Sequence, residues 1–289
     1  MGIDGDSKKI NKINHGKDEI YTVAQKNGIN YDVTENHILT LKFTNVEGIF
    51  WNKRGFKQCV EFKEKDITLD AYILGMWLGD GTTAEPAITN IDEEIIEYIY
   101  KFADDNDLRV SIRNQKKTEC KTYYIAGNPI NIFRDSLNKY KLIGNKHIPN
   151  EYLYNTREIR LKVLAGLMDS DGYMHHNTYE IIQKSNKLST DIQELSKSLG
   201  FKTSYRKVNK ACVKPNGDRV TGEYNKIIIS GEHLTDVPVI LARKKATKCM
   251  KKVNFLITTI TVASTKNDKF VSFKVEDNSS FFGVDYTVL

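Results

Sequence analysis

Two aspartates occupy equivalent positions in a segment that occurs twice in the chain. The first copy is YILGMWLGDG, from Tyr72 to Gly81, and the second is VLAGLMDSDG, from Val163 to Gly172. Each copy is a short apolar run that ends in a small residue, an aspartate and a glycine, so Asp80 corresponds to Asp171. An internal repeat of this kind predicts two similar structural units, with one carboxylate at the same point of each.

Small residues recur four positions apart within each copy. Gly75 precedes Gly79 in the first copy, and Gly166 precedes Ser170 in the second. On a helix this spacing places both small residues on one face, where the backbone of a partner helix can approach closely. We therefore expect the two copies to be helices that pack together and bring their C-terminal ends side by side.

Two carboxylates at neighbouring helix C-termini are unfavourable, because the helix dipole is negative there and the two charges repel each other. A divalent cation that prefers oxygen ligands, above all Mg²⁺, would compensate for this charge and could also bind phosphate oxygens. The glycine after each aspartate predicts a left-handed helix cap. The alternative, that each Asp-Gly pair only ends a helix, explains a single copy better than two matching ones.

The segments that follow the two copies have a similar order, which predicts two α+β halves. Extended pieces are expected at 86–90 and 179–184, helices at 92–107 and 189–199, strands at 109–113, 121–126, 203–208 and 226–230, and a helical stretch near 130–140. The flanks have strand-like patterns instead. Asn27-Gly28 predicts a hairpin turn within 19–43, and the tail from Lys269 also alternates, so the chain ends are expected to pair around the duplicated middle.

Charge is unevenly distributed along the 289 residues, whose net charge is +6. The segment 197–252 holds 14 Lys or Arg against four Asp or Glu, whereas 80–107 holds nine acids and a single Lys. This asymmetry predicts one surface that faces a polyanion and one that faces solvent. A charged surface that binds no partner is the open alternative.

Several classes of protein are disfavoured by composition. No apolar run approaches the ~20 residues of a membrane span, and the start of the chain lacks the pattern of a secretory signal or a transit peptide. We therefore expect no membrane partner and a reducing, intracellular compartment. The four cysteines are far apart and form no CxxC pair, which disfavours a zinc knuckle or a disulfide framework.

The two copies resemble the signature of the LAGLIDADG homing endonucleases, VLAGLMDSDG almost letter for letter. The resemblance implies two αββαββα halves related by a pseudo-two-fold axis, and a monomer whose β-saddle lies on double-stranded DNA at a long asymmetric site. It also implies that Asp80 and Asp171, together with Gly79 and Ser170, bind Mg²⁺, with Mn²⁺ able to substitute. Each metal-activated water would then attack the phosphodiester of one strand.

The flanks are similar to intein splicing (Hint) domains. TENHIL resembles the TxxH block, which implies that Thr34 and His37 polarise a scissile peptide, and FFGVDYTVL resembles the start of the C-terminal block. The terminal Cys or Ser and the terminal His-Asn of an intein are not in the sequence, so we expect truncated splicing segments and no splicing. The expected domains are an N-terminal Hint part with linker (1–69), the two halves (70–160 and 161–252), and a C-terminal Hint part (253–289).

The intein-encoded group also carries one lysine in each active site, and two positions fit. Lys146 precedes an Ile-Pro dipeptide upstream of the second motif, and Lys245 lies in the basic run LARKKATK, with Lys244 as the second choice. A lysine beside a scissile phosphate can stabilise the negative charge of the transition state or help to deprotonate the water. For Lys245, simple phosphate anchoring is the alternative.

Further residues are predicted to contact DNA from the strands and the basic run. These are Arg109, Arg113, Tyr205, Lys207, Lys210, Arg243 and Lys244. His175 and His176 are not expected to bind metal, because Mg²⁺ prefers oxygen ligands. Trp77 is expected to pack in the helix interface rather than to stack on a base.

The resulting prediction is a site-specific, Mg²⁺-dependent DNA endonuclease encoded within an intein and embedded in a host protein. It would act where the host DNA lies, in the nucleus or in the cytoplasm of a prokaryotic or viral host. Three alternatives remain: a DNA-binding relic that no longer cleaves, an autocatalytic splicing module, and an RNA-splicing maturase. Retention of both aspartates disfavours the first, the missing junction residues disfavour the second, and the Hint-like flanks disfavour the third.

Overall fold

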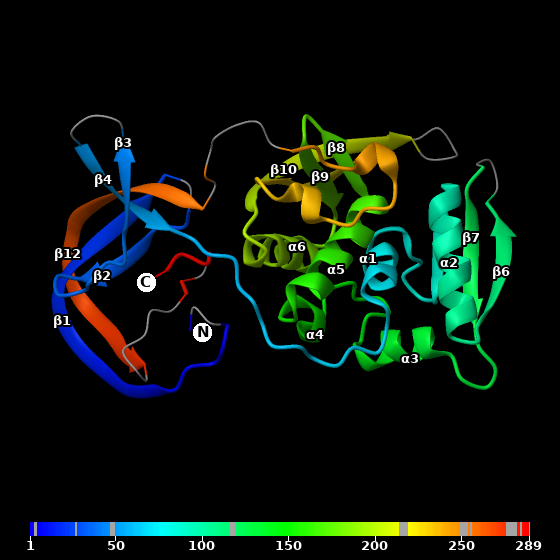
Figure 1. Cartoon of the computed structure of the whole chain (residues 1–289), viewed down its shortest axis with the longest axis horizontal. Coiled ribbons are helices and arrows are strands. Elements are labelled where there is room, and N and C mark those ends of the chain that lie inside the picture. Colours follow the sequence, from blue (N-terminus) through cyan, green and yellow to red (C-terminus); the bar gives the residue numbers. More distant parts are fainter. Residues whose placement is uncertain are drawn as a thin grey trace. The chain divides into compact units, whose positions relative to one another are not determined.

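The chain forms two compact units in the computed structural model (Figure 1). Unit 1 comprises 1–63 and 252–289, and unit 2 comprises 64–251. The structure describes all residues except 3–4, 27, 47–49, 116–118, 214–218, 249–253, 255, 276–281, 284 and 289. The unit boundaries lie close to the ends of the segment expected to carry the two halves.

Unit 1 is built on a sheet in the order β2-β1-β12-β4-β3. The longest pairing is antiparallel and joins the two ends of the chain, from Ile10 opposite Val275 to Gln25 opposite Ile260. This confirms the expected pairing of the flanks, whereas Asn27 of the expected hairpin turn lies outside the described residues. The strands are β1 (Ile10–Gln25), β2 (Tyr31–Thr34), β3 (Lys42–Val46), β4 (Phe50–Phe56) and β12 (Ile257–Val275).

Unit 2 repeats one order of elements, which confirms the predicted α+β class with two halves. The first half contains α1 (Ala71–Asp80), β5 (Ala87–Asn90), α2 (Glu93–Asp105), β6 (Arg109–Asn114), β7 (Lys121–Ala126) and α3 (Ile132–Lys139). After α4 (Asn150–Leu153), the second half contains α5 (Arg157–Asp169), β8 (Gly172–His175), β9 (Thr178–Gln183), α6 (Asn186–Ser198), β10 (Lys202–Val213) and β11 (Arg219–Ser230). The 3-10 turns η1 (Leu234–Asp236) and η2 (Ala242–Lys244) follow.

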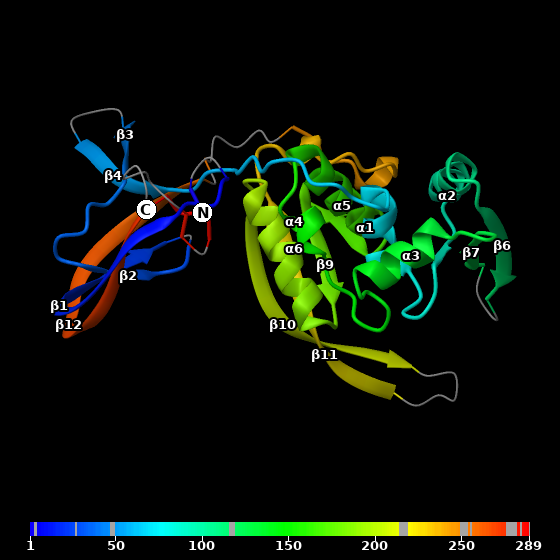
Figure 2. The ribbon, with the colours of Figure 1, turned by 90° about the horizontal axis from the view of Figure 1, so that it is seen from below.

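The two halves differ in their sheets. The second half has four strands in the order β10-β11-β9-β8, whereas the first has three in the order β5-β7-β6. The first half has no counterpart of β8 among the described residues, only a single bridge between Gly81 and Ile88. The β10–β11 hairpin extends beyond the helices of its half (Figure 2).

Helices α1 and α5 pack through their glycines, as predicted. A Cβ on Gly75 would lie 2.2 Å from the Val163 carbonyl oxygen, and a Cβ on Gly166 would lie 2.2 Å from that of Tyr72. The helices are therefore in backbone contact at a point where any larger residue would collide. Trp77 is fully buried in α1 and its Nε1 donates to the Glu85 carbonyl at 2.9 Å. It lies about 200° around the helix from Gly75, so its side chain packs against the loop after α1 and not in the helix interface that was predicted.

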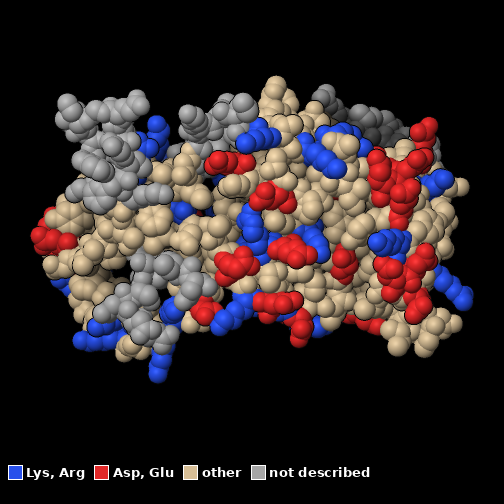
Figure 3. Space-filling model, in the orientation of Figure 1, with Lys and Arg blue, Asp and Glu red and all other residues tan. Residues whose placement is uncertain are grey.

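The acidic stretch forms the exposed side of α2. Its apolar residues Ile95, Ile99 and Phe102 are buried, while its carboxylates face solvent and contribute to the red surface over α2 in Figure 3. This agrees with the expectation of a solvent-facing acidic surface. None of the helices in the described part of the chain has the length and apolar character that a membrane crossing requires.

Candidate active site

The C-terminal ends of α1 and α5 place the two motif aspartates close together. Asp80 is the last residue of α1, and Asp171 follows Ser170, the C-cap of α5. A Cβ on Gly79 would lie 2.0 Å from Ser170 Oγ, so the two helix ends are in contact. The structure thus brings together the pair of carboxylates that the repeat predicted.

The glycines after the aspartates serve a different purpose from the one expected. Gly81 has φ −72° and ψ 150°, and neither it nor Gly172 has a positive φ, so the predicted left-handed caps are wrong. A Cβ on Gly81 would lie 2.3 Å from the Trp77 carbonyl oxygen, and one on Gly172 would lie 2.7 Å from that of Met168. These glycines are required by close packing on the preceding helical turn.

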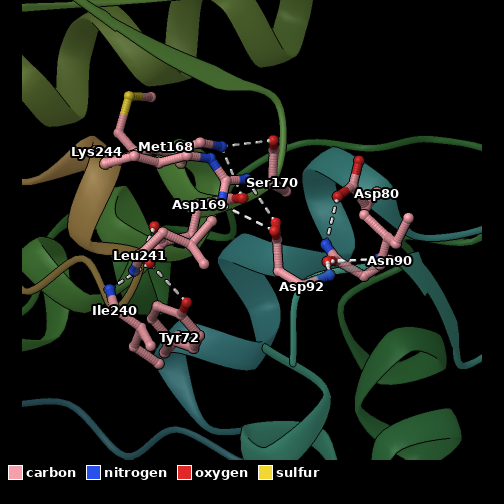
Figure 4. Close-up of polar contacts among 12 residues, drawn as sticks. Tyr72, Asp80, Asn90, Asp92, Met168, Asp169, Ser170, Ile240, Leu241 and Lys244 are labelled. Carbon is pink, nitrogen blue, oxygen red and sulfur yellow. Dashed lines mark hydrogen bonds and ion pairs between the residues drawn. The ribbon is translucent and has the colours of Figure 1, made fainter. Parts of the chain in front are cut away.

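Each aspartate accepts a hydrogen bond from a side-chain amide at the end of a strand. Asn90 Nδ2, on the last residue of β5, donates to Asp80 Oδ2 at 3.0 Å (Figure 4). Gln183 Nε2, on the last residue of β9, donates to Asp171 Oδ2 at 2.6 Å. Neither amide was predicted, although Asn90 is the last residue of the predicted extended piece 86–90 and Gln183 is the second-last residue of the piece 179–184.

Each helix end also binds a lysine ammonium through main-chain carbonyls. Lys146 Nζ donates to Gly79 at 3.2 Å and to Gly81 at 2.7 Å. Lys244 Nζ donates at 2.8, 2.8 and 3.1 Å to the carbonyls of the three residues before Asp171, which are Met168, Asp169 and Ser170 (Figure 4). A cation is stabilised at these positions because the last carbonyls of a helix have no helical donor.

Lys244, rather than Lys245, is therefore the counterpart of Lys146. Lys244 is the last residue of the η2 turn and only 9% exposed, whereas Lys245 is exposed. The predicted catalytic placement of Lys245 is corrected accordingly, since consecutive residues of a turn point in different directions. Lys244 was also expected to contact DNA, and its contacts with α5 occupy it instead.

Burial and mutual repulsion set the electrostatics of the site. Burial, assisted by the charge of Asp171, raises the pKa of Asp80 to about 6, while Lys244, Asn90 and Lys146 act in the opposite direction. Burial lowers the pKa of Lys146 to about 8 against the attraction of both aspartates, and it also lowers the pKa of Lys244.

This chemistry fits a divalent cation. A buried carboxylate whose ionisation is opposed by burial and by a second carboxylate is stabilised by a cation with oxygen ligands. Gly79 and Ser170 were also predicted to bind the metal, but their carbonyl oxygens accept hydrogen bonds from Lys146 and Lys244. The carboxylates of Asp80 and Asp171 are therefore the principal candidates for metal ligands. The described residues contain no cluster of three or more His, Cys, Asp or Glu suited to a metal.

A buried carboxylate in α5 fixes the segment that leads to Lys244. Asp169 accepts from Tyr72 Oη at 2.7 Å and from the backbone nitrogens of Ile240 and Leu241 at 2.6 and 3.3 Å (Figure 4). The first motif has Leu78 at the equivalent position, so this anchor exists only in the second half. Its sequence signal is the additional aspartate of VLAGLMDSDG.

The strand residues predicted to contact DNA lie on different faces of their sheets, because successive side chains of a strand point to opposite faces. Arg109 and Arg113 are exposed on β6, on the side opposite the buried Tyr123 and Ile125. The Arg113 guanidinium lies 5.2 Å from the centre of the Tyr124 ring. Both arginines are thus exposed on one face of the sheet, and their contact with DNA stays a prediction.

The predicted contacts of β10 fall on opposite sides. Tyr205 Oη donates to Asn225 at 2.7 Å, and Lys207 Nζ donates to Asn186 of α6 at 3.3 Å, so both lie on the side of the helices. Lys210 has the other parity and lines a pocket of about 480 Å³ with Asp171 and Tyr224. The prediction is therefore wrong in orientation for Tyr205 and Lys207.

Arg206 shares the parity of Lys210 and was missed. Counting every second residue back from Lys210 would have found it. Arg243, also predicted to contact DNA, instead makes an ion pair with Asp92 (N–O 2.7 Å).

The two splicing-block residues lie together in unit 1. The backbone nitrogen of His37 donates to the Thr34 carbonyl at 3.0 Å. Both line a pocket of about 460 Å³ whose other walls include Ser272 of β12. His37 Nε2 is buried without a hydrogen-bond partner among the described residues, and burial lowers the pKa of His37.

Comparison with known proteins gives a family match that lies almost entirely in unit 2 and ends four residues beyond it. Residues 147–255 match the family model described as Homing endonuclease. This range contains the second motif and Lys244 but not the first motif.

Two curated relatives match part of the chain. The replicative DNA helicase DnaB of Mycobacterium intracellulare is 29% identical over 154 residues, which cover 52% of this chain and 23% of that protein. The homothallic switching endonuclease of Saccharomyces cerevisiae is 28% identical over 167 residues, covering 45% of this chain and 27% of that protein. The chain thus spans about a quarter of the length of these relatives.

Solved structures of I-DmoI show weak similarity. The complex with DNA and Ca has a TM-score of 0.40 at 14% identity, covering 56% of this chain and 83% of that chain. Mesophilic variants of I-DmoI give a TM-score of 0.39 at the same identity, covering 56% of this chain and 88% of that chain.

Proposed function

We propose that the chain makes a site-specific, Mg²⁺-dependent double-strand break in DNA. The match of residues 147–255 to the family model described as Homing endonuclease and the two LAGLIDADG-like motifs support this proposal. One observation carries the proposal: Asp80 and Asp171 meet at the ends of α1 and α5, each with an amide donor and a lysine beside it. Two equivalent centres of this kind suit a reaction that occurs once on each strand.

The chain's own residues hold and orient the reacting groups. If held by the carboxylates of Asp80 and Asp171, Mg²⁺ would supply positive charge at the phosphate and lower the pKa of a water molecule. Asn90 and Gln183 fix the rotation of the carboxylates, since each amide donates to one carboxylate oxygen. Lys146 and Lys244 place positive charge beside the site, where it can stabilise charge on a pentacovalent phosphorus.

The proposed partner is double-stranded DNA with a long asymmetric site, bound by a monomer. Arg109 and Arg113 of the first half, and Arg206 and Lys210 of the second, lie on sheet faces opposite the buried core. Such cationic rows suit contacts with backbone phosphates, which position a protein on DNA. The proposed location is intracellular, wherever the host DNA lies.

An intein origin is supported by unit 1, in which both ends of the chain share one sheet. Thr34 and His37 line one pocket there, as the TxxH resemblance implies. We infer that a host protein flanks this chain. The alternative of a cleavage-dead relic is disfavoured because both aspartates keep their amide and lysine partners.

Cleavage of a plasmid library of candidate host DNA tests the proposal. The protein should linearise a subset of plasmids in Mg²⁺ and none in EDTA. Asp80→Asn and Asp171→Asn should bind the selected plasmid without linearising it. Linearisation by both variants at the wild-type rate would refute the assigned site, and a wild-type protein that binds but never cuts would favour the relic.

A further inference from the structure

We propose that the ion pair between Arg243 and Asp92 is a brace that joins the two halves and couples the two strand cuts. This inference rests on the proposed endonuclease function. It assigns both residues a positioning role, because neither is adjacent to the motif carboxylates in sequence and neither contacts them.

The pair is bidentate and joins elements that are far apart in the chain. Arg243 Nη1 donates to Asp92 Oδ1 at 2.8 Å, and Nη2 donates to Oδ2 at 2.7 Å. Arg243 belongs to η2 at the end of the second half, and Asp92 is the N-cap residue of α2 in the first. Among the ion pairs between described residues, this one alone joins the first half to the second.

Each residue of the ion pair lies one or two positions in sequence from a side chain that donates a hydrogen bond to a motif aspartate or to the helix end before it. Arg243 immediately precedes Lys244, which binds the carbonyls at the end of α5. Asp92 follows Asn90 by two residues, and its backbone nitrogen donates to Asn90 Oδ1 at 2.9 Å. Because Asn90 Nδ2 in turn donates to Asp80, the pair links the support of one aspartate to the support of the other.

The carboxylate of Asp92 has no competing structural task in α2. An aspartate at an N-cap normally accepts from the backbone of the first turn, but Asp92 makes no such side-chain cap bond. Its side chain is 20% exposed and that of Arg243 is 58% exposed. A single exposed ion pair contributes little stability, whereas a planar bidentate pair fixes orientation well.

Loss of the ion pair should therefore loosen the contacts of Lys244 or of Asn90 at one aspartate, while α1 and α5 stay packed together. We expect the first strand to be cut at close to the normal rate and the second more slowly, so that nicked plasmid accumulates. The ratio of second-strand to first-strand rates should fall roughly 2- to 30-fold, the range found when coupling between sites is disturbed.

The experiment is a double-mutant cycle on a supercoiled plasmid that the wild-type protein cuts. Asp92→Asn, Arg243→Gln and the double variant are compared by single-turnover kinetics of nicked and linear product. A brace predicts that both single variants lower the ratio equally and that the double variant is no worse. Glu158→Gln, which breaks the exposed Glu158–Lys162 pair within α5, is the matched control and should leave the ratio unchanged.

A DNA contact by Arg243 would give a different pattern. Arg243→Gln alone would weaken binding and reduce the salt dependence of affinity by about one phosphate contact, while Asp92→Asn would bind as well as wild type or better. That result, or unequal single variants whose effects add, would overturn the brace.

Amide hydrogen exchange tests the structural role of the ion pair without any DNA cleavage. A wild-type protein that cuts no DNA would count against the proposed function alone. Asp92→Asn should raise exchange in the segment 240–248 and at the start of α2, and not in α6. Unchanged exchange in the segment 240–248 would contradict the inference.

Discussion

Lys244 and Lys146 make the same contact at the ends of the two motif helices. Each ammonium donates to main-chain carbonyls that flank or precede a motif aspartate, at 2.8–3.1 Å for Lys244 and 2.7–3.2 Å for Lys146. The two lysines reach these positions from unrelated segments, a loop before α4 and the η2 turn. The symmetry of the site is therefore one of contacts and not of sequence.

Neighbouring lysines provide the sharpest test of this symmetry. Lys244→Met should lower the cleavage rate of one strand by roughly 10²-fold, because a cation fixed beside the phosphate stabilises charge that develops in the transition state. Lys245→Met should change that rate by no more than a few-fold, since the Lys245 side chain is exposed to solvent. Strand-resolved single-turnover kinetics measure both. A larger loss for Lys245→Met than for Lys244→Met would reverse the assignment.

The pH dependence of cleavage follows from the lowered pKa of Lys146. Burial brings this pKa from 10.5 to about 8, so the fraction of charged lysine falls as the pH rises through 8. If the ammonium stabilises transition-state charge, the rate should decline above about pH 8, by up to tenfold per pH unit. Lys146→Arg keeps the charge at high pH and should move the decline upward. A wild-type rate that rises to a plateau near pH 8 would instead assign Lys146 to deprotonation of the water.

Removing the charge of Asp80 should stabilise the protein in the absence of metal. The pKa of Asp80 is raised from 3.8 to about 6 on folding, so the folded state favours the protonated carboxyl. The stability that this protonation provides is fully present below about pH 3.8 and is lost as the pH rises through 6. Asp80→Asn should therefore raise the free energy of unfolding at pH 7.5 by an amount on the order of 2–3 kcal/mol.

Urea unfolding in EDTA measures this difference, and it should shrink at pH 4.5, where the wild-type carboxyl is largely protonated. Added Mg²⁺ should stabilise the wild-type protein at pH 7.5 and should affect Asp80→Asn much less. A variant less stable than wild type at pH 7.5 in EDTA would contradict an unfavourable burial of the Asp80 charge.

The repeated motif was sufficient to predict the two halves and the paired aspartates, because small residues four apart on each helix permit the backbones to come into contact. Sequence spacing could not decide between Lys244 and Lys245, since which of them faces α5 depends on where a three-residue turn begins. Nor could it identify Asn90 and Gln183, whose role depends on where a strand ends relative to a helix terminus. These features are set by tertiary contacts that local patterns do not contain.

The alternation of side chains along β10 determines which of its basic residues can contact DNA. Arg206 and Lys207 are adjacent on β10, and successive side chains of a strand point to opposite faces. Lys207 binds Asn186 and Glu223 on the side of α6, whereas Arg206 shares the face of Lys210. Arg206→Ala should thus weaken DNA binding across sequences and reduce the slope of log affinity against log salt by about 1, and Lys207→Ala should do neither. Fluorescence anisotropy with labelled duplex at several salt concentrations measures both slopes. Equal losses for the two variants would show that both faces of β10 contact DNA and that parity does not govern its readout.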